Sequence, residues 1–159
     1  MTWTRVQTAI LTTALVAPIY QLLLRLPPTF PGIVGAPCRL LGAIGLVVAI
    51  VPYVQARKAL GSRLRIEPSP AAAGDLIISG VFGRVRHPMY AALVLGSVAW
   101  ALLWNSVWGL FVDTLVVAFL GAKIRREEEL LAEMYPAYAA YRRAVPALLP
   151  RFQRPGKMS

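Results

Sequence analysis

The sequence predicts an all-α, polytopic membrane protein with about four transmembrane helices and a cytoplasmic C-terminal helical segment. Hydrophobic residues make up 57% of the 159 residues and charged residues only 15%, whereas soluble domains are about half apolar and a quarter charged. One crossing takes roughly 20 mostly apolar residues. Four crossings therefore leave no room for a separate soluble catalytic domain, and we treat residues 1–159 as a single integral-membrane domain.

Four apolar runs define the predicted spans. The first run is too long for the hydrophobic region of a signal peptide. Four prolines within residues 27–37 then break the helix and form a turn-rich connection. Only Asn105 and Ser106 separate the last two runs, which predicts a tight helical hairpin. The spans are expected over residues 6–26, 40–56, 88–104 and 107–122.

The placement of the basic residues predicts the topology. The chain has 17 Lys and Arg against 7 Asp and Glu, a formal charge of +10. Cytoplasmic loops retain Lys and Arg. With the N-terminus inside, 15 basic residues fall on the cytoplasmic side and only Arg25 and Arg39 on the other. Both termini and the loop over residues 57–86 are therefore expected in the cytoplasm, and the charge needs no nucleic-acid partner.

Two carboxylates lie on the apolar side of the predicted tail helix. At about 100° per residue, Glu128 falls within about 40° of Ile124 and Glu127 within about 60°, whereas Arg126 falls on the opposite half. Ionised side chains are not expected beside an apolar face unless they have a partner. We therefore treat these two glutamates as candidate ligand-binding residues.

A second polar feature precedes the third span. Pro88 suits the first turn of a helix, where its missing N–H costs nothing. Free N–H groups and the positive dipole end favour an anion there, and Arg86 adds a fixed charge. His87 is the single histidine of the chain. The simpler alternative is a set of interfacial cations that touch lipid phosphates. Combined with the two glutamates, however, the helix start could hold a small zwitterion.

The order of these features resembles a known family, the membrane-bound isoprenylcysteine carboxyl methyltransferases and the related phospholipid methyltransferases. The resemblance covers residues 74–150. Four elements carry it in order: Arg86-His87-Pro88-Met89-Tyr90, then Glu127-Glu128 with Leu131, then Tyr135-Pro136 with Tyr138 and Tyr141, and finally Val145-Pro146-Ala147-Leu148-Leu149-Pro150. The chain departs from the family where Ala91 and Ala92 replace a frequent glycine and where Tyr135-Pro136 replaces Phe-Gly.

The resemblance implies S-adenosylmethionine as the cofactor, held by residues 74–90 and 123–150, and no metal. Lys123 occupies a position at which the family can carry an arginine that faces the substrate carboxylate. By motif position, the cofactor-binding residues are Leu76, Ile77, Phe82, Arg86, His87, Pro88, Met89, Tyr90, Glu127 and Glu128.

The expected activity is methyl transfer at the membrane to a lipophilic or small acceptor, and a carboxylate acceptor is favoured. A carboxylate is ionised at neutral pH and needs only a cation, such as Lys123 or Arg126, to position it. An amine or thiol would have to lose a proton, and His87 is the side chain with a suitable pKa. An apolar tail could enter sideways between the helices from the lipid bilayer.

Two other functions stay open on the sequence. A sterol-reductase-like NADPH enzyme would favour asparagine at position 88 and an Arg-Asp pair in place of Glu127-Glu128. A non-enzymatic four-helix membrane protein or small transporter would make Asp113 its central residue.

Asp113 is exceptional because a carboxyl inside a span costs about 2.5–3.5 kcal/mol on insertion scales. The simplest role for it is a structural hydrogen bond to Thr12, Thr13 or Gln21 of another span.

Overall fold

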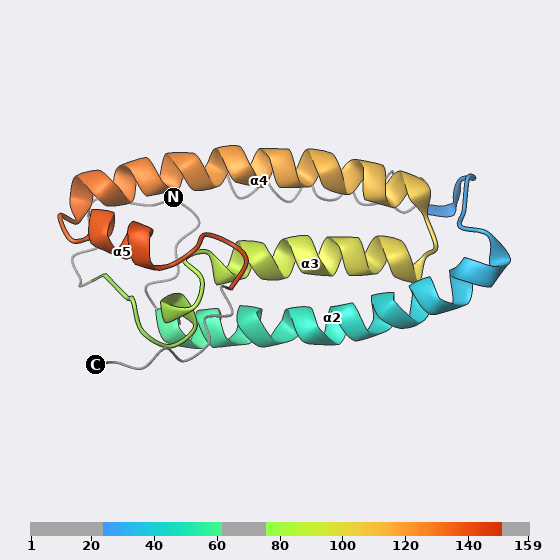
Figure 1. Ribbon diagram of the computed structural model, residues 1–159, viewed down its shortest axis with the longest axis horizontal. Coiled ribbons are helices and arrows are strands. Elements are labelled where there is room, and N and C mark those ends of the chain that lie inside the picture. The colour runs from blue at the N-terminus through green and yellow to red at the C-terminus, as the bar shows by residue number, and fades with distance from the viewer. Residues whose placement is uncertain (1–23, 62–75, 151–159) are drawn as a thin grey trace, which may run out of the picture.

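The computed structural model describes residues 24–61 and 76–150, and within these ranges it contains helices and no strand. The four α-helices are α2 (Gly32–Leu60), α3 (Pro88–Leu103), α4 (Val107–Met134) and α5 (Tyr138–Ala144), and a short 3₁₀ helix, η2, covers Gly80–Gly83. The long helices α2, α3 and α4 run alongside one another, with η2 and α5 together at one end (Figure 1). The predicted all-α class is confirmed for the described residues.

Two of these helices are long and apolar enough to cross a membrane. They are α2 and α4, and α3 is a shorter apolar helix. The expected hairpin between α3 and α4 is confirmed: the Ser106 side chain caps α4 by accepting a hydrogen bond from the Gly109 N–H at 3.1 Å. Most of the predicted first span lies outside the described residues.

Helix α2 begins earlier than the sequence predicts. It starts at Gly32 rather than at residue 40, so Pro37 lies inside the helix, as does Pro52. The expectation that Pro37 belongs to a turn-rich connection is wrong. A proline removes one backbone hydrogen bond, and transmembrane helices tolerate this because packing and local adjustments compensate for the loss.

A stripe of small residues brings α2 against α3. The buried residues of α2 are Gly35, Gly42, Ala49 and Ala56, which recur every seven positions and so share one face. A Cβ on Gly42 would lie 2.5 Å from the Leu103 nitrogen and 2.6 Å from the Ala99 carbonyl oxygen. The two backbones are therefore in direct contact, which is typical of helix pairs in membranes.

Helix α4 does not end at residue 122. It continues without a break to Met134, so the fourth span and the amphipathic tail helix are a single helix. Its 28 residues extend over about 42 Å, whereas the hydrocarbon core is about 30 Å thick. Helix α4 is thus longer than one crossing requires, and its last turns carry the candidate carboxylates.

The C-terminal segment folds back onto the start of α3. The N–H groups of Arg86 and His87 donate to the carbonyl oxygens of Pro146 and Ala147, each at 2.9 Å. The Tyr141 hydroxyl donates to the Phe82 carbonyl oxygen in η2 at 2.7 Å. These contacts join η2, α3 and α5 at one end of the bundle, where the candidate site residues gather.

Candidate functional site

The guanidinium group of Arg86 forms hydrogen bonds with other residues of the chain. Its Nε and Nη2 atoms donate to Glu128 Oε1 at 2.9 and 2.7 Å. Its Nη1 atom donates to the carbonyl oxygens of Arg142, at 2.8 Å, and Val145. The other oxygen of Glu128 pairs with Arg142 Nε at 3.0 Å. We call Arg86, Glu128 and Arg142 the arginine clamp, because they fasten α4, α5 and the residue after α5 to the start of α3.

The arginine clamp changes the expected role of the helix start. The sequence predicts free N–H groups and a free guanidinium there, ready for an anion. The N–H groups of Arg86 and His87 instead bond to the C-terminal segment, and the guanidinium bonds to Glu128 and two carbonyl oxygens. The chain's own acceptors thus occupy these donors.

His87 lies between the two adjacent glutamates. Its Nε2 atom is 3.1 Å from Glu128 Oε1 and its Nδ1 atom is 3.8 Å from Glu127 Oε2. The residue is 8% exposed, and burial lowers its pKa although both carboxylates act in the opposite direction. At neutral pH the ring is therefore neutral. The shorter contact assigns the proton to Nε2, so Nδ1 carries the lone pair.

Tyr90, Lys123 and Glu127 form a second group, which we call the open cluster. The Tyr90 hydroxyl donates to Glu127 Oε1 at 2.5 Å. Lys123 Nζ lies 5.6 Å from the centre of the Tyr90 ring, and the His87 ring stacks against the same tyrosine at 5.7 Å. The Glu127 side chain is 18% exposed, against 4% for Glu128. Neighbouring carboxylates therefore have different environments: Glu128 is enclosed by cations, and Glu127 remains accessible.

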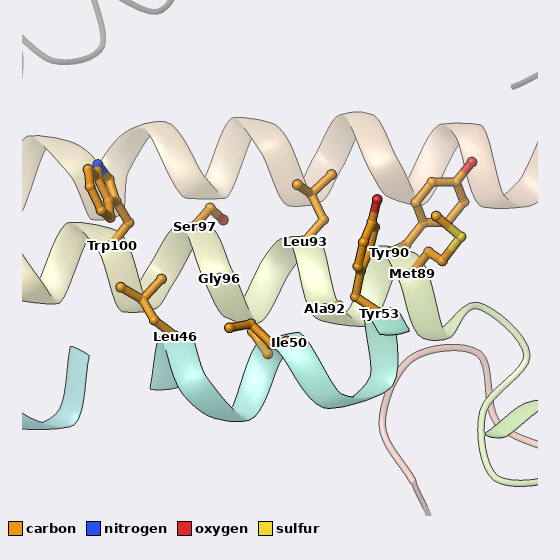
Figure 2. A pocket seen from close by; sticks show the side chains of 11 residues that line it. Leu46, Ile50, Tyr53, Met89, Tyr90, Ala92, Leu93, Gly96, Ser97 and Trp100 are labelled. Atoms are coloured by element: carbon orange, nitrogen blue, oxygen red, sulfur yellow. The ribbon is translucent and has the colours of Figure 1, made fainter. Parts of the chain in front are cut away.

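An apolar groove of about 540 Å³ begins at the open cluster. Helices α2 and α3 line it, and Tyr90 and Met89 lie at one end while Trp100 lies at the other (Figure 2). Its remaining lining residues are Leu46, Ala49, Ile50, Tyr53, Ala92, Leu93, Gly96 and Ser97. Tyr90 borders both the groove and the open cluster, so an amphiphilic molecule would meet charged groups at one end and apolar side chains along its length.

The structure brings most of the predicted site residues together, with one clear exception. Arg126 is on the other side of α4, with 72% of its side chain exposed and a 3.4 Å ion pair to Glu129. This follows from the rotation of about 100° per helical residue. The structure therefore does not bring Arg126 to the other predicted site residues, contrary to its expected place beside Lys123.

The remaining predicted residues surround the start of α3. Leu76 and Ile77 are half-buried in the segment before η2, and Pro88 is buried. Phe82 is half-buried in η2, where its carbonyl oxygen accepts the bond from Tyr141.

Sequence reasoning missed Arg142 and the groove residues Tyr53 and Ser97. No short-range pattern marks Arg142, because its partner Glu128 lies on a different helix. The aromatic pair on α5 does have a sequence signal. Tyr138 and Tyr141 pack edge to face at 5.8 Å, and burial raises the pKa of each to about 12, so both hydroxyls are neutral.

The sequence pattern of phospholipid methyltransferases matches residues 37–138, well over half of the chain. The chain belongs to the phospholipid methyltransferase family. Members of this family are membrane proteins that use S-adenosylmethionine as methyl donor. The match includes most of α2, all of α3 and α4, and hence the arginine clamp up to Glu128, the open cluster and the groove.

Two curated proteins are similar to part of the chain. The cobalt-zinc-cadmium resistance protein CzcN of Cupriavidus metallidurans is 35% identical over 77 residues, which cover 48% of this chain and 36% of that protein. The nickel-cobalt-cadmium resistance protein NccN of Alcaligenes xylosoxydans xylosoxydans is 31% identical over 78 residues, which cover 48% of this chain and 37% of that protein. The match thus spans little more than a third of each relative.

Proposed function

We propose that the chain transfers a methyl group from S-adenosylmethionine to the carboxylate of an amphiphilic acceptor whose apolar tail lies in the groove. The observation that carries this proposal is the continuity at Tyr90, which contacts Glu127 in the open cluster and also lines the groove. Charged groups of both signs thus meet the apolar groove at the start of α3. This arrangement suits a reaction between a charged cofactor and a lipid-like acceptor.

The open cluster fits the cofactor by its donor set. Glu127 is an accessible carboxylate and suits the ammonium group of S-adenosylmethionine. Tyr90 and Met89 present apolar surface beside it, and Leu76, Ile77 and Phe82 are further contacts by motif position. When bound, S-adenosylmethionine supplies a sulfonium methyl group, which a carboxylate oxygen takes as the carbon–sulfur bond breaks and its electron pair stays on sulfur.

The residues of the chain act mainly by alignment. Lys123 reaches the open cluster over the Tyr90 ring and positions the acceptor carboxylate as a cation. The arginine clamp fixes His87, which in turn stacks on Tyr90, so the clamp positions the cluster without touching the reactants. Holding two reactants in line can be worth several kcal/mol of the barrier. For an amine or thiol acceptor, Nδ1 of His87 would accept the proton.

The first test of the proposal measures the affinity of the cofactor for the parent protein and for a variant at Glu127. Calorimetry of the detergent-solubilised protein should show saturable binding of S-adenosylmethionine and S-adenosylhomocysteine. Glu127→Gln should weaken both by roughly 10- to 100-fold, the effect of losing a hydrogen bond to a charged group. Glu129→Gln is the matched control, because its exposed carboxylate pairs only with Arg126 among the described residues. Saturable binding of NADPH alone would overturn the proposal and favour a reductase.

The acceptor class is tested with radiolabelled methyl donor and three probes that share one tail: dodecanoic acid, dodecylamine and dodecanethiol. A methyl ester is labile to base, whereas methylated amines and thioethers are stable, so the product identifies the acceptor atom. We expect the ester, and we expect Lys123→Met to raise the KM for dodecanoic acid while Arg126→Met, the same change on the exposed face of α4, leaves it unchanged. Transfer to the amine or thiol alone would show that the carboxylate assignment is wrong.

A further inference from the structure

Asp113 is a buried carboxyl that the proposed reaction does not use. It lies in α4 with 3% of its surface exposed, and neither carboxyl oxygen forms a hydrogen bond of normal geometry with the described residues. It is seven residues into α4, about 10 Å from the helix start and thus inside the hydrocarbon core. Thr12, Thr13 and Gln21, the partners predicted from the sequence, lie outside the described residues. A buried carboxyl that has no partner among the described residues is costly unless another group satisfies it, and such groups commonly mark functional sites.

Among the described residues, Ser97 of α3 is the polar side chain that lies near enough to Asp113 to influence its carboxyl group. The Ser97 hydroxyl donates to the Val94 carbonyl oxygen at 3.1 Å, so its proton is already engaged. What Ser97 still offers toward the groove is an acceptor oxygen. A ligand that bonds to Ser97 must therefore donate a hydrogen bond.

Ser97 also lines the apolar groove. It follows Tyr90 by seven residues, or about two helical turns, so both side chains lie on one side of α3 and about 10 Å apart along its axis. Figure 2 shows Tyr90, Leu93, Ser97 and Trp100 along the same side of α3. A molecule that extends from the open cluster into the groove passes Ser97.

We infer that Ser97, backed by Asp113, is a second recognition point of the groove, which binds a hydroxyl group on the apolar tail of the acceptor about 10 Å from the methylated group. The acceptor class is then a hydroxylated amphiphile rather than a plain alkyl carboxylate. A carbonyl or ether in the tail would not serve, because it cannot donate. The inference rests on the proposed function, which places the methylated group of the acceptor at the open cluster and its tail in the groove.

Binding of three fatty acids tests the inference without any methyl donor. The probes are dodecanoic acid, its 8-hydroxy derivative and its alpha-hydroxy derivative, and Trp100 in the groove supplies a fluorescence signal. We expect the 8-hydroxy acid, whose hydroxyl lies about 10 Å from its carboxylate in an extended chain, to bind roughly three- to tenfold more tightly than dodecanoic acid, which corresponds to one net hydrogen bond. The alpha-hydroxy acid should show no such gain, because its hydroxyl lies at the wrong end. Equal affinity for all three probes would overturn the inference.

Ser97→Ala and Asp113→Leu should each remove the preference for the 8-hydroxy acid. Thr114→Val is the matched control: it removes a hydroxyl from the next residue of α4, but Thr114 is exposed and bonds to the Phe111 carbonyl oxygen. A preference that persists in both groove variants would contradict the inference. Failure of the proposed function is distinguishable, because it would leave this binding preference intact while no methyl transfer occurs.

Melting of the ligand-free protein separates a ligand site from a structural one. If a ligand is the partner of Asp113, Asp113→Leu should leave the melting temperature unchanged or raise it, because an unsatisfied carboxyl is removed. If a residue of the chain is the partner, the same variant should melt at a clearly lower temperature, and the inference would be wrong.

Discussion

Glu127 and Glu128 are adjacent in sequence, yet their carboxylates contact different groups. Glu128 accepts from Arg86 and Arg142 and contacts His87, whereas Glu127 accepts only the Tyr90 hydroxyl among the hydrogen bonds of the described residues. A rotation of about 100° separates neighbouring side chains on a helix, and this is enough to direct one toward the C-terminal segment and the other toward the groove.

The first prediction distinguishes the two glutamates by the effect of their replacement on the stability of the protein. Glu128→Gln should destabilise the protein by about 3–5 kcal/mol, because it leaves a buried guanidinium without its carboxylate. Glu127→Gln should change the melting temperature little but abolish most cofactor binding. Thermal melting of the solubilised variants checks this, and equal losses of stability would contradict the division of roles.

A second prediction concerns the pH dependence at His87. Its pKa in the folded protein is below the ordinary value of about 6.5, so the folded state binds fewer protons than the unfolded state in that range. Stability from this residue is therefore present at neutral pH and is lost as the pH falls below about 6.5. Glutamine in its place keeps a donor for Glu128 but does not titrate.

The check is the melting temperature from about pH 7.5 to about pH 5.5, where unperturbed histidine titrates. The parent protein should lose more stability than His87→Gln over this range. Parallel curves would show that His87 is not buried as a neutral ring.

At the scale of elements, contact between α2 and α3 builds the groove. Gly42 has no space for a side chain, because a Cβ would meet backbone atoms of Leu103 and Ala99. Gly121 of α4, by contrast, has nothing within 4 Å of the same position. The two glycines therefore allow a matched comparison.

We predict that Gly42→Ala destabilises the protein by about 1–3 kcal/mol, since the helices must separate to admit the methyl group. Gly121→Ala should be neutral or stabilise by up to about 1 kcal/mol through helix propensity. Denaturant or thermal unfolding in detergent measures both. A neutral Gly42→Ala variant would show that the helices are not in backbone contact.

At the scale of the whole molecule, the two ends of the bundle have different compositions. The end with α5 carries the arginine clamp and the open cluster, and the other end carries the turn at Asn105 and Ser106 beside Thr29 (Figure 1). The distribution of basic residues predicts that the α5 end faces the cytoplasm.

Labelling with a membrane-impermeant maleimide tests this orientation. In a Cys38→Ser background, Ala139→Cys on α5 should react only when the cytoplasmic face is accessible, and Thr29→Cys only from the other face. Both positions are exposed, so both should react in detergent. Reaction of both from one side would contradict the predicted topology.

Sequence by itself determined the helical class, the hairpin at Asn105 and Ser106, the family motifs and the face of the tail helix that carries Glu127 and Glu128. These features depend on hydropathy, short-range turn chemistry and helical period, all of which are local. It misplaced the start of α2, because a proline ends an isolated helix but not one supported by neighbouring helices. It also placed Arg126 in the site, although the exposed face of α4 carries it.

Only the tertiary structure decided which groups are free to bind. Arg86 is paired because residues 142–147 fold back over the start of α3, and Ser97 lines the groove because α2 and α3 approach at Gly42. These contacts join residues far apart in the chain, and their free energy depends on packing rather than on local preference. For that reason, charge and spacing identified the candidate carboxylates, whereas only the fold shows that Glu128 is enclosed by cations and Glu127 is more exposed.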